Sequence, residues 1–138
     1  MKPNWLYTQS GVIPYRETHG MTQLILITSR KGKKWIFPKG IVEKGLTPEK
    51  SAQKEALEEA GVLGTIETEV GEYYYKKWQG ICMVTVYALR VNTILEEWQE
   101  KNKRQRQIVT LDEAVQLIKN KKLIEMVQRH FLVARKTL

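Results

Sequence analysis

The sequence predicts an α/β (α+β) fold in which helices pack on both sides of a mixed β-sheet. Strand-length apolar segments, bounded by turn residues, fill much of the chain before residue 110. One helical segment interrupts them at 48–60, and the C-terminal third has apolar residues at helical spacing. Strands that alternate with one central helix and two terminal helices are typical of an α/β/α sandwich.

The first part of the chain predicts two strands and a short apolar segment that leads into a glycine loop. In order, we expect a strand at 5–16, a turn at 17–20, a strand at 23–29, a basic loop at 30–34 and an apolar segment at 35–37. A loop at Gly40 follows and connects this part to the central helix.

The central helix has clear start and stop signals. Thr47 is a hydroxyl residue that suits the N-cap, Pro48 suits the first helical position, and Glu49 places an acid in the first turn. Gly61 marks the C-terminal end. We therefore expect a helix over about 48–60.

The remainder of the chain predicts strands followed by two helices. We expect strands at 62–70, 72–79 and 81–91, a charged connection at 92–103, and a short strand at 107–110. Thr110 suits the N-cap of a short helix that begins at Leu111. A last helix follows, because these residues recur at helical spacing: Leu123, Met126, Val127, His130, Phe131 and Ala134.

Length and composition limit the function classes. The 138 residues suit a single domain, 1–138, with its own core. No apolar run reaches the length of a membrane span, and the N-terminus lacks a signal-peptide core. The single Cys82 cannot form an internal disulfide, so we expect a cytoplasmic protein without membrane contact. The net charge of +8 favours anionic partners such as polyphosphates or nucleic acids.

Three glutamates near the end of the central helix indicate a metal site. Glu55, Glu58 and Glu59 are related as i, i+3 and i+4, which puts them on one face of an α-helix. The helix dipole and mutual repulsion disfavour anions there. A divalent cation such as Mg²⁺ turns this repulsion into coordination, because it prefers carboxylate and phosphate oxygens. Taken alone, the cluster better fits a solvated acidic face, in which Lys54 partly neutralises Glu58.

The surrounding residues resemble the Nudix box, G-x5-E-x7-R-E-U-x-E-E-x-G-U, in which U is a bulky aliphatic residue. The matching positions are Gly40, Glu55, Glu58, Glu59, Gly61 and Val62. The preceding Trp35-Ile-Phe-Pro-Lys39 is similar to the family's lead-in. The resemblance implies a Nudix-type α/β/α sandwich with a mixed β-sheet and a loop-helix-loop catalytic motif.

The resemblance also implies the chemistry. Glu55, Glu58 and Glu59 are then metal-binding carboxylates, and the Gly40 carbonyl is a further ligand for Mg²⁺ or Mn²⁺. Glu58 and Glu59 form the catalytic pair. Water attacks phosphorus in a diphosphate linkage, while the protein supplies positioning and electrostatics. The general base is either Glu59 or a carboxylate from another loop.

Candidates outside the box come from loops and strands. Glu96 and Glu97 are possible bases by position, although a solvated loop explains them better. Lys39 stands beside the metal loop and suits a substrate phosphate. Arg30 is either a second phosphate contact or part of a charged hairpin, and Tyr75 either stacks on a substrate ring or belongs to the core.

Two positions depart from the box. Leu46 replaces its first glutamate and Lys54 replaces its arginine, two residues that commonly pair with each other in the family. Losing both leaves no orphan charge, because Lys54 can face solvent or Glu58. We therefore expect an intact metal site, with the effect of the departures confined to the loop.

The predicted function is hydrolysis of a diphosphate linkage in a phosphorylated small molecule. The resemblance implies substrates such as nucleoside polyphosphates. The Phe-Pro-Lys-Gly lead-in and the basic charge are similar to those of family members that act on dinucleoside polyphosphates or diphosphoinositol polyphosphates. An alternative is a Nudix-fold protein that binds RNA or processes RNA 5′ ends, because the basic segment 101–106 suits a phosphate backbone. The retained glutamates argue against a pure binding module.

Overall fold

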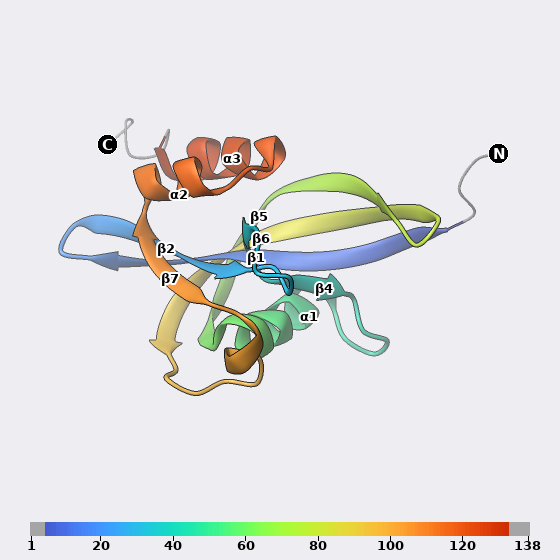
Figure 1. Cartoon of the computed structure of the whole chain (residues 1–138), viewed down its shortest axis with the longest axis horizontal. Helices are drawn as coiled ribbons and strands as arrows, with labels where there is room; N and C mark the ends of the chain where they lie inside the picture. Colours follow the sequence, from blue (N-terminus) through green and yellow to red (C-terminus); the bar gives the residue numbers. More distant parts are fainter. Residues whose placement is uncertain (1–4, 133–138) are drawn as a thin grey trace.

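A computed structural model describes residues 5–132 and shows a seven-stranded mixed sheet with helices on both faces (Figure 1). Its strands are β1 (Leu6–Thr18), β2 (Met21–Thr28), β3 (Trp35–Ile36), β4 (Lys39–Ile41), β5 (Val62–Lys77), β6 (Gly80–Ile94) and β7 (Arg106–Thr110). Its helices are α1 (Pro48–Glu55) with the π-helical turn η1 (Ala56–Ala60), the 3₁₀ turn η2 (Lys101–Lys103), α2 (Leu111–Leu117), and α3 (Lys121–Val127) with the π-helical turn η3 (Gln128–Leu132).

β1 is the central strand of the sheet. It pairs in parallel with β6, and β6 pairs in turn with the edge strand β5. On its other side β1 is shared, because residues 9–11 pair with β4 and residues 15–18 pair with β2, antiparallel in both cases. β2 also pairs with β3 and β7. The divided pairing of β1 places Gly40 directly opposite Ser10.

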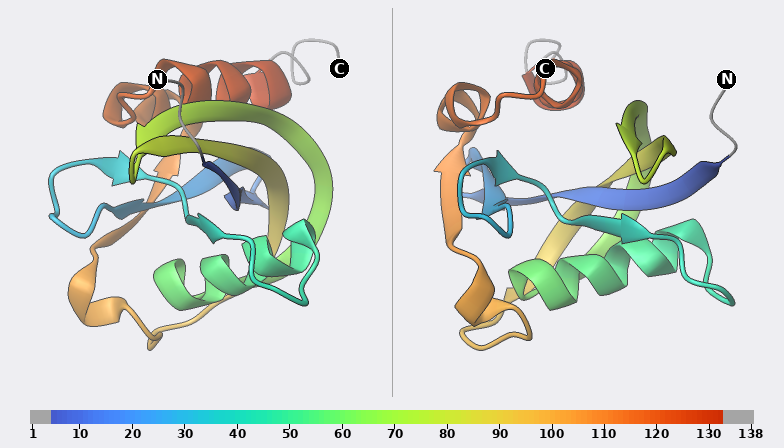
Figure 2. Two further views of the ribbon diagram at one scale, coloured as in Figure 1. Left: turned by 90° about the vertical axis from the view of Figure 1, so that its right-hand side faces the viewer. Right: turned by 45° about the vertical axis from the view of Figure 1, so that its right-hand side comes forward.

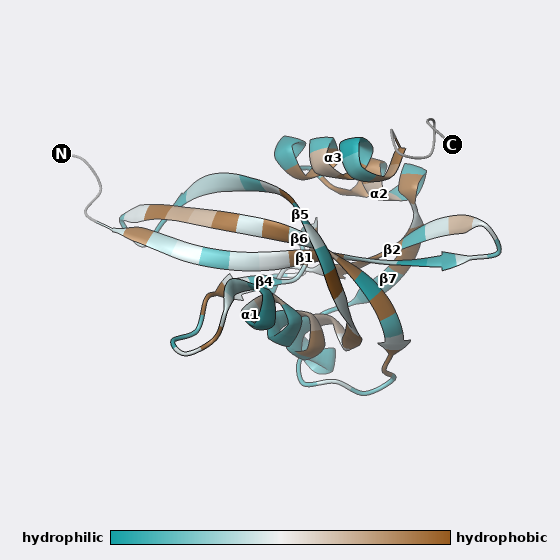
Figure 3. Ribbon diagram, turned by 180° about the vertical axis from the view of Figure 1, so that it is seen from behind, coloured by the Kyte–Doolittle hydropathy of each residue, from teal (hydrophilic) through white to brown (hydrophobic). Residues whose placement is uncertain are grey.

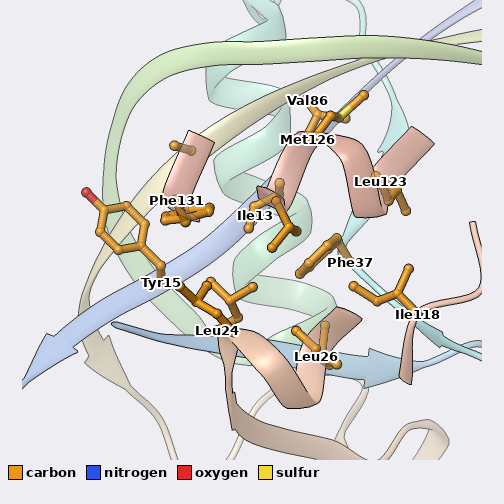
Figure 4. Close-up of a cluster of buried hydrophobic side chains, with 14 of the residues drawn as sticks. Ile13, Tyr15, Leu24, Leu26, Phe37, Val86, Ile118, Leu123, Met126 and Phe131 are labelled. Atoms are coloured by element: carbon orange, nitrogen blue, oxygen red, sulfur yellow. The ribbon is translucent and has the colours of Figure 1, made fainter. Parts of the chain in front are cut away.

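Two cores lie on opposite faces of the sheet, and Figure 2 shows the helices that cover each face. α1 and η1 cover one face, over Val12 and Ile25. The C-terminal helices cover the other, where Leu24, Phe37 and Phe131 belong to a larger cluster (Figure 4). Bands of different hydropathy along the long strands in Figure 3 reflect the alternation of side chains between the two faces. The arrangement is the predicted α/β/α sandwich.

The main difference from the predicted elements is β5. The two strands expected on either side of Gly71 form one bent strand, because register shifts in its pairing with β6 absorb the irregular residues. Gly71 lies at one of these shifts, where a side chain would meet Met126 at 3.0 Å. Trp78 and Gln79 form the two-residue turn into β6, with φ angles of 54° and 58°.

The other predicted elements are present with small shifts at their ends. Thr110 caps α2 through a capping box with Glu113, which confirms the predicted start of that helix. The last helix continues to Leu132 through η3, while Ala134 lies outside the described residues. Between residues 5 and 132, no helix is long and apolar enough to cross a membrane. The single domain over 1–138 stays a prediction.

Candidate active site

The glutamate helix forms where predicted, and small residues bring it close to the sheet. Thr47 accepts a hydrogen bond from a first-turn amide at 3.1 Å, so the predicted N-cap is confirmed. Ala52, Ala56 and Ala60 are fully buried against the sheet. Because these side chains are short, the helix lies close to the strands, and its last turns reach the loop at Gly40.

Glu55 and Glu59 meet β4 at Lys39 and Gly40, where the sequence predicted a loop and the structure has a short strand paired with β1. A Cβ atom at Gly40 would lie 2.4 Å from the Glu55 carboxyl group, so a larger residue there would displace that carboxyl group. Glu59 is buried, and its Oε1 accepts a hydrogen bond from the Lys39 amide at 3.2 Å. The end of the helix and β4 together therefore form a partly buried acidic site.

Glu58 is placed differently from the other two acids. Its side chain is 25% exposed and lies 3.7 Å from Lys54 Nζ. The chain is π-helical over 56–60, so the α-helical spacing that predicted one shared face no longer applies there. Among the residues that the structure describes, no three acidic, histidine or cysteine side chains form a ready metal cluster. Mutual repulsion and the neighbouring Lys54 account for the outward position of Glu58.

Glu55 and Glu59 hold protons more tightly than ordinary glutamates. Burial raises the pKa of Glu59 to about 8, while the charge of Arg104 opposes the rise and that of Glu55 adds to it. Burial also raises the pKa of Glu55, where the hydrogen bond with Glu59 opposes the rise and the charge of Glu58 adds to it. A divalent cation bound between these groups would favour their ionised forms.

The residues around Gly40 fit a hard divalent cation. Glu55 lies against Gly40 and Glu59 against the Lys39 amide, so both bring carboxyl oxygens to β4, and Glu58 adds a carboxyl group at the same end of the helix. Ser10, which pairs with Gly40 in register, has a fully buried hydroxyl without a hydrogen-bond partner in the described part of the chain. The unpaired Ser10 hydroxyl and the close approach of the Glu55 carboxyl group to Gly40 are both consistent with Mg²⁺ or Mn²⁺.

Lys39 connects the acidic site to a second group of polar residues. Its backbone contacts Glu59, while its Nζ lies 2.9 Å from the Tyr75 hydroxyl and 3.4 Å from Gln9 Oε1. The Tyr75 hydroxyl donates to Gln9 at 2.8 Å. Burial lowers the pKa of Lys39, and the nearby charge of Lys77 lowers it further. The structure thus brings together two of the predicted substrate residues, Lys39 and Tyr75.

A pocket of about 390 Å³ opens beside Lys39. Its walls come from β3, β5 and the segment that joins α2 to α3. The lining includes Lys34, Lys39 and Lys119, four aromatic rings and no acidic side chain. Walls of this kind suit a compact or ring-bearing group that carries negative charge.

The sequence argument missed two buried charged residues at this site. Arg104 lies 3.4 Å from Glu59, and its Nε donates to Glu100 at 2.8 Å. The only signal in the sequence is the i, i+4 spacing of Glu100 and Arg104, which is also common on protein surfaces. The predicted bases Glu96 and Glu97 are exposed instead.

The predicted phosphate contact Arg30 lies outside the pocket lining. Its side chain is 60% exposed and pairs with Glu100 at 3.4 Å. Lys34, at the other end of the same basic loop, lines the pocket. A role for Arg30 in substrate binding therefore stays a prediction.

The departure at Lys54 is compensated within the loop. Lys54 Nζ lies 2.7 Å and 2.9 Å from the two carboxylate oxygens of Glu43. Glu43 precedes Leu46 by three residues, so it supplies the partner that the box places at position 46. Lys54 contacts Glu58, as the sequence suggested, and it also pairs with Glu43, which the sequence argument did not consider.

Comparison with known proteins places this geometry in a family context. The NUDIX domain model matches residues 8–132. Nudix hydrolase 4 of Arabidopsis thaliana is 38% identical over 120 residues, which covers 80% of this chain and 58% of that protein. Diphosphoinositol polyphosphate phosphohydrolase 3-beta of Bos taurus is 26% identical over 118 residues, which covers 84% of this chain and 71% of that protein. The chain thus spans less than two thirds of the plant relative.

A solved structure shares the fold. The C. elegans Ap4A hydrolase, in a binary complex, superposes with a TM-score of 0.75 and 19% sequence identity. The superposition covers 96% of this chain and 99% of that one. At this level of identity the comparison concerns the fold, and it confirms the predicted sandwich with its mixed sheet.

Proposed function

This chain belongs to the Nudix family, and from that membership we propose that it is a metal-dependent pyrophosphohydrolase. The observation that carries the proposal is the placement of the half-buried Glu55 against Gly40 and of the buried Glu59 against the Lys39 amide, beside a pocket lined with lysines. Two carboxylates with little access to water destabilise a fold when both are ionised, and a bound cation would add to the compensation that Arg104 gives Glu59. Their position next to a cationic pocket supports a site where a metal and a phosphorylated substrate meet.

The acids and the loop have distinct roles in the proposed mechanism. Glu55, Glu58 and Glu59 would hold Mg²⁺ or Mn²⁺, with the Gly40 carbonyl as a further ligand. When bound, the cation neutralises phosphate charge and lowers the pKa of coordinated water. Glu59 takes the proton of the attacking water, because the Lys39 amide fixes its Oε1 at the site. Gly40 keeps the backbone close to the Glu55 carboxylate.

Lys39 and the pocket bind the substrate in this proposal. The Lys39 ammonium contacts a phosphate next to the cleaved linkage, and Tyr75 orients that ammonium through its hydroxyl. The remainder of the substrate enters the pocket, where Lys34 and Lys119 add positive charge. The protein thereby contributes position and charge, which are the main terms in phosphoryl transfer to water.

We propose a substrate rich in phosphate, either a nucleoside or dinucleoside polyphosphate or a diphosphoinositol polyphosphate. The three lysines of the pocket and the net charge of +8 favour phosphates beyond the cleaved pair. The names of the bovine relative and of the C. elegans protein contain diphosphoinositol polyphosphate and Ap4A respectively. Both names support the phosphate-rich class without choosing between its members.

A hydrolysis screen with Mg²⁺ or Mn²⁺ tests the proposal. The panel contains nucleotide sugars, dinucleoside polyphosphates, diphosphoinositol polyphosphates and capped or triphosphorylated RNA, with the Glu59→Gln protein as the control for contaminating activity. We expect the highest kcat/KM on a phosphate-rich small molecule. Faster hydrolysis of a nucleotide sugar would overturn the substrate class, and no metal-dependent turnover on any member would overturn the enzyme.

The basic segment 101–106 supports the RNA alternative less than the sequence suggested. Arg104 contacts Glu59 and Glu100, and Arg106 lies 4.0 Å from the Trp98 ring centroid, so both guanidinium groups are engaged within the fold. Lys101 and Lys103 are the exposed cations that remain beside them, and Lys101 pairs with Glu97. RNA therefore remains only as a member of the panel, and a cytoplasmic location stays a prediction.

A further inference from the structure

The segment of residues 95–106, called the clasp here, closes over the C-terminal end of the glutamate helix. It donates to four successive backbone carbonyls: Glu100 N to Glu58 at 3.0 Å, Trp98 Nε1 to Glu59 at 3.0 Å, Arg106 Nη1 to Ala60 at 2.8 Å and Leu95 N to Gly61 at 2.8 Å. The last carbonyls of a helix have no partner within the helix. The clasp satisfies them, so it fixes the helix end that carries Glu58 and Glu59.

Arg104 is the clasp residue that reaches the acidic site itself. Its Nη2 lies 3.4 Å from Glu59 Oε2, and its Nε donates to Glu100 Oε1 at 2.8 Å. Its Nη1 donates to the Thr28 carbonyl, at the end of β2, at 2.9 Å. The side chains of Arg104, Glu100 and Glu59 are 6%, 9% and 10% exposed. One planar guanidinium therefore joins the clasp, the glutamate helix and the sheet in a single buried arrangement.

Metal binding alone does not account for an arginine at this position. A fixed positive charge beside a cation site repels the cation, and low exposure to solvent strengthens that repulsion. The geometry suggests a different benefit. The Lys39 amide donates to Oε1 of Glu59, and Arg104 lies against Oε2, so both oxygens of this carboxylate are held.

We propose that Arg104 is a positioning residue, which fixes the Glu59 carboxylate for turnover and weakens metal binding in doing so. The inference rests on the proposed function, because it takes Glu59 to act at the metal. Arg104 contacts neither substrate nor cation in this role and acts through Glu59. Glu100 holds the guanidinium in place from the other side.

Three variants separate the charge of Arg104 from its geometry. Arg104→Met removes both, and Arg104→Lys keeps the charge but replaces the planar fork with a single ammonium. Arg90→Met is the matched control, because Arg90 pairs with Glu67 at 2.8 Å on the face of the sheet that α3 covers, beside Tyr15. For each protein we would measure Mn²⁺ binding by calorimetry, kcat and KM at saturating Mn²⁺, and the unfolding midpoint with and without Mn²⁺.

The expected result is a split between metal affinity and rate. Arg104→Met binds Mn²⁺ severalfold more tightly, because the repulsive charge is gone, and its unfolding midpoint rises more on adding Mn²⁺. Its kcat falls about 10- to 100-fold at saturating Mn²⁺ with little change in KM, since a misplaced carboxylate slows the chemical step. Arg104→Lys returns Mn²⁺ affinity towards the unmodified value but leaves kcat reduced. Arg90→Met changes none of these quantities.

Several outcomes would overturn the positioning role. These are an unchanged kcat in Arg104→Met, weaker Mn²⁺ binding by that variant, or full kcat in Arg104→Lys. If Arg104→Met does not fold, Arg104→Lys decides, with reduced kcat in support and full kcat against. If the unmodified protein hydrolyses no substrate in the screen, the proposed function fails. Mn²⁺ affinity still tests the inference, because tighter binding by Arg104→Met supports it and weaker binding overturns it.

Discussion

The two faces of the sheet are built from different kinds of side chain. On the face that α2 and α3 cover, large apolar residues such as Leu24, Phe37 and Phe131 form a continuous core (Figure 4). On the face that α1 covers, alanines line the helix, and the charged residues Glu59 and Arg104 lie buried at its end. One face therefore supplies most of the apolar burial, and the other holds the acids Glu55 and Glu59, which repel each other when ionised, close to Arg104.

This difference explains how the fold tolerates an unfavourable site. Burial of large apolar side chains stabilises the folded state, whereas a buried ion pair contributes little net stability. The face with the larger core can offset the cost of carboxylates that meet at Gly40 on the opposite face. Substitutions on the two faces should then separate activity from stability.

The largest expected effect is on the α1 face, from Glu59→Gln. We expect kcat to fall about 10²- to 10³-fold, as when a charged group that acts in the transition state is removed. The protein should stay folded, because glutamine has the same size and relieves repulsion with Glu55. Steady-state kinetics and thermal unfolding with and without Mn²⁺ measure both effects. Glu49→Gln, an exposed acid in the first turn of the same helix, is the matched control.

The outcome tests the site assignment directly. Full activity in Glu59→Gln would remove Glu59 from the proposed mechanism. Loss of folding would instead assign Glu59 to stability, and the contrast between the two faces would then be wrong.

On the α2–α3 face, we expect Leu24→Ala to lower stability and to leave kcat nearly unchanged. Leu24 is fully buried, so the substitution should lower the free energy of unfolding by about 2–5 kcal/mol. At temperatures well below the unfolding midpoint, kcat should change by less than about twofold, because Leu24 lies across the sheet from α1. Denaturant unfolding and kinetics at low temperature measure the two quantities. Met21→Ala on the same strand is the control, since Met21 is 52% exposed.

A fall in kcat that matches the loss of stability in Leu24→Ala would contradict this independence. It would mean that the larger core transmits its packing to the acidic site through β1 and β2. An unchanged free energy of unfolding would show that the core relaxes around the missing side chain.

Local signals predicted the elements well, whereas long-range contacts decided the exceptions. Thr47 and Gly61 mark the ends of the glutamate helix because capping depends on neighbouring residues. Gly71 has the local signature of a break between strands, yet it forms a bulge in β5. Its actual environment is Met126, which is distant in sequence and packs against it.

At the candidate site, too, local patterns were predictable and long-range contacts were not. Gly40, Glu55 and Glu59 were predictable because their spacing along the chain carries the motif. Arg104 was not, because its burial depends on the Thr28 carbonyl and on Glu59, which come from other parts of the fold. In sequence alone, Arg104 is one cation in a basic segment, and nothing local distinguishes it from its exposed neighbours.

The smallest expected effect concerns an exposed ion pair on the α1 face. Lys54 pairs with Glu43 and Glu58, but its side chain is 44% exposed, so solvent and salt screen both pairs. We expect Lys54→Ala to change kcat/KM by less than about threefold, as for most surface substitutions. A double-mutant cycle with Glu43→Ala should give a small coupling that declines as salt rises. Lys50→Ala, on the same helix, is the control. If Lys54→Ala instead matched the loss in Glu59→Gln, Lys54 would be required to orient Glu58, and the working site would extend from the buried acids to the exposed side of the helix.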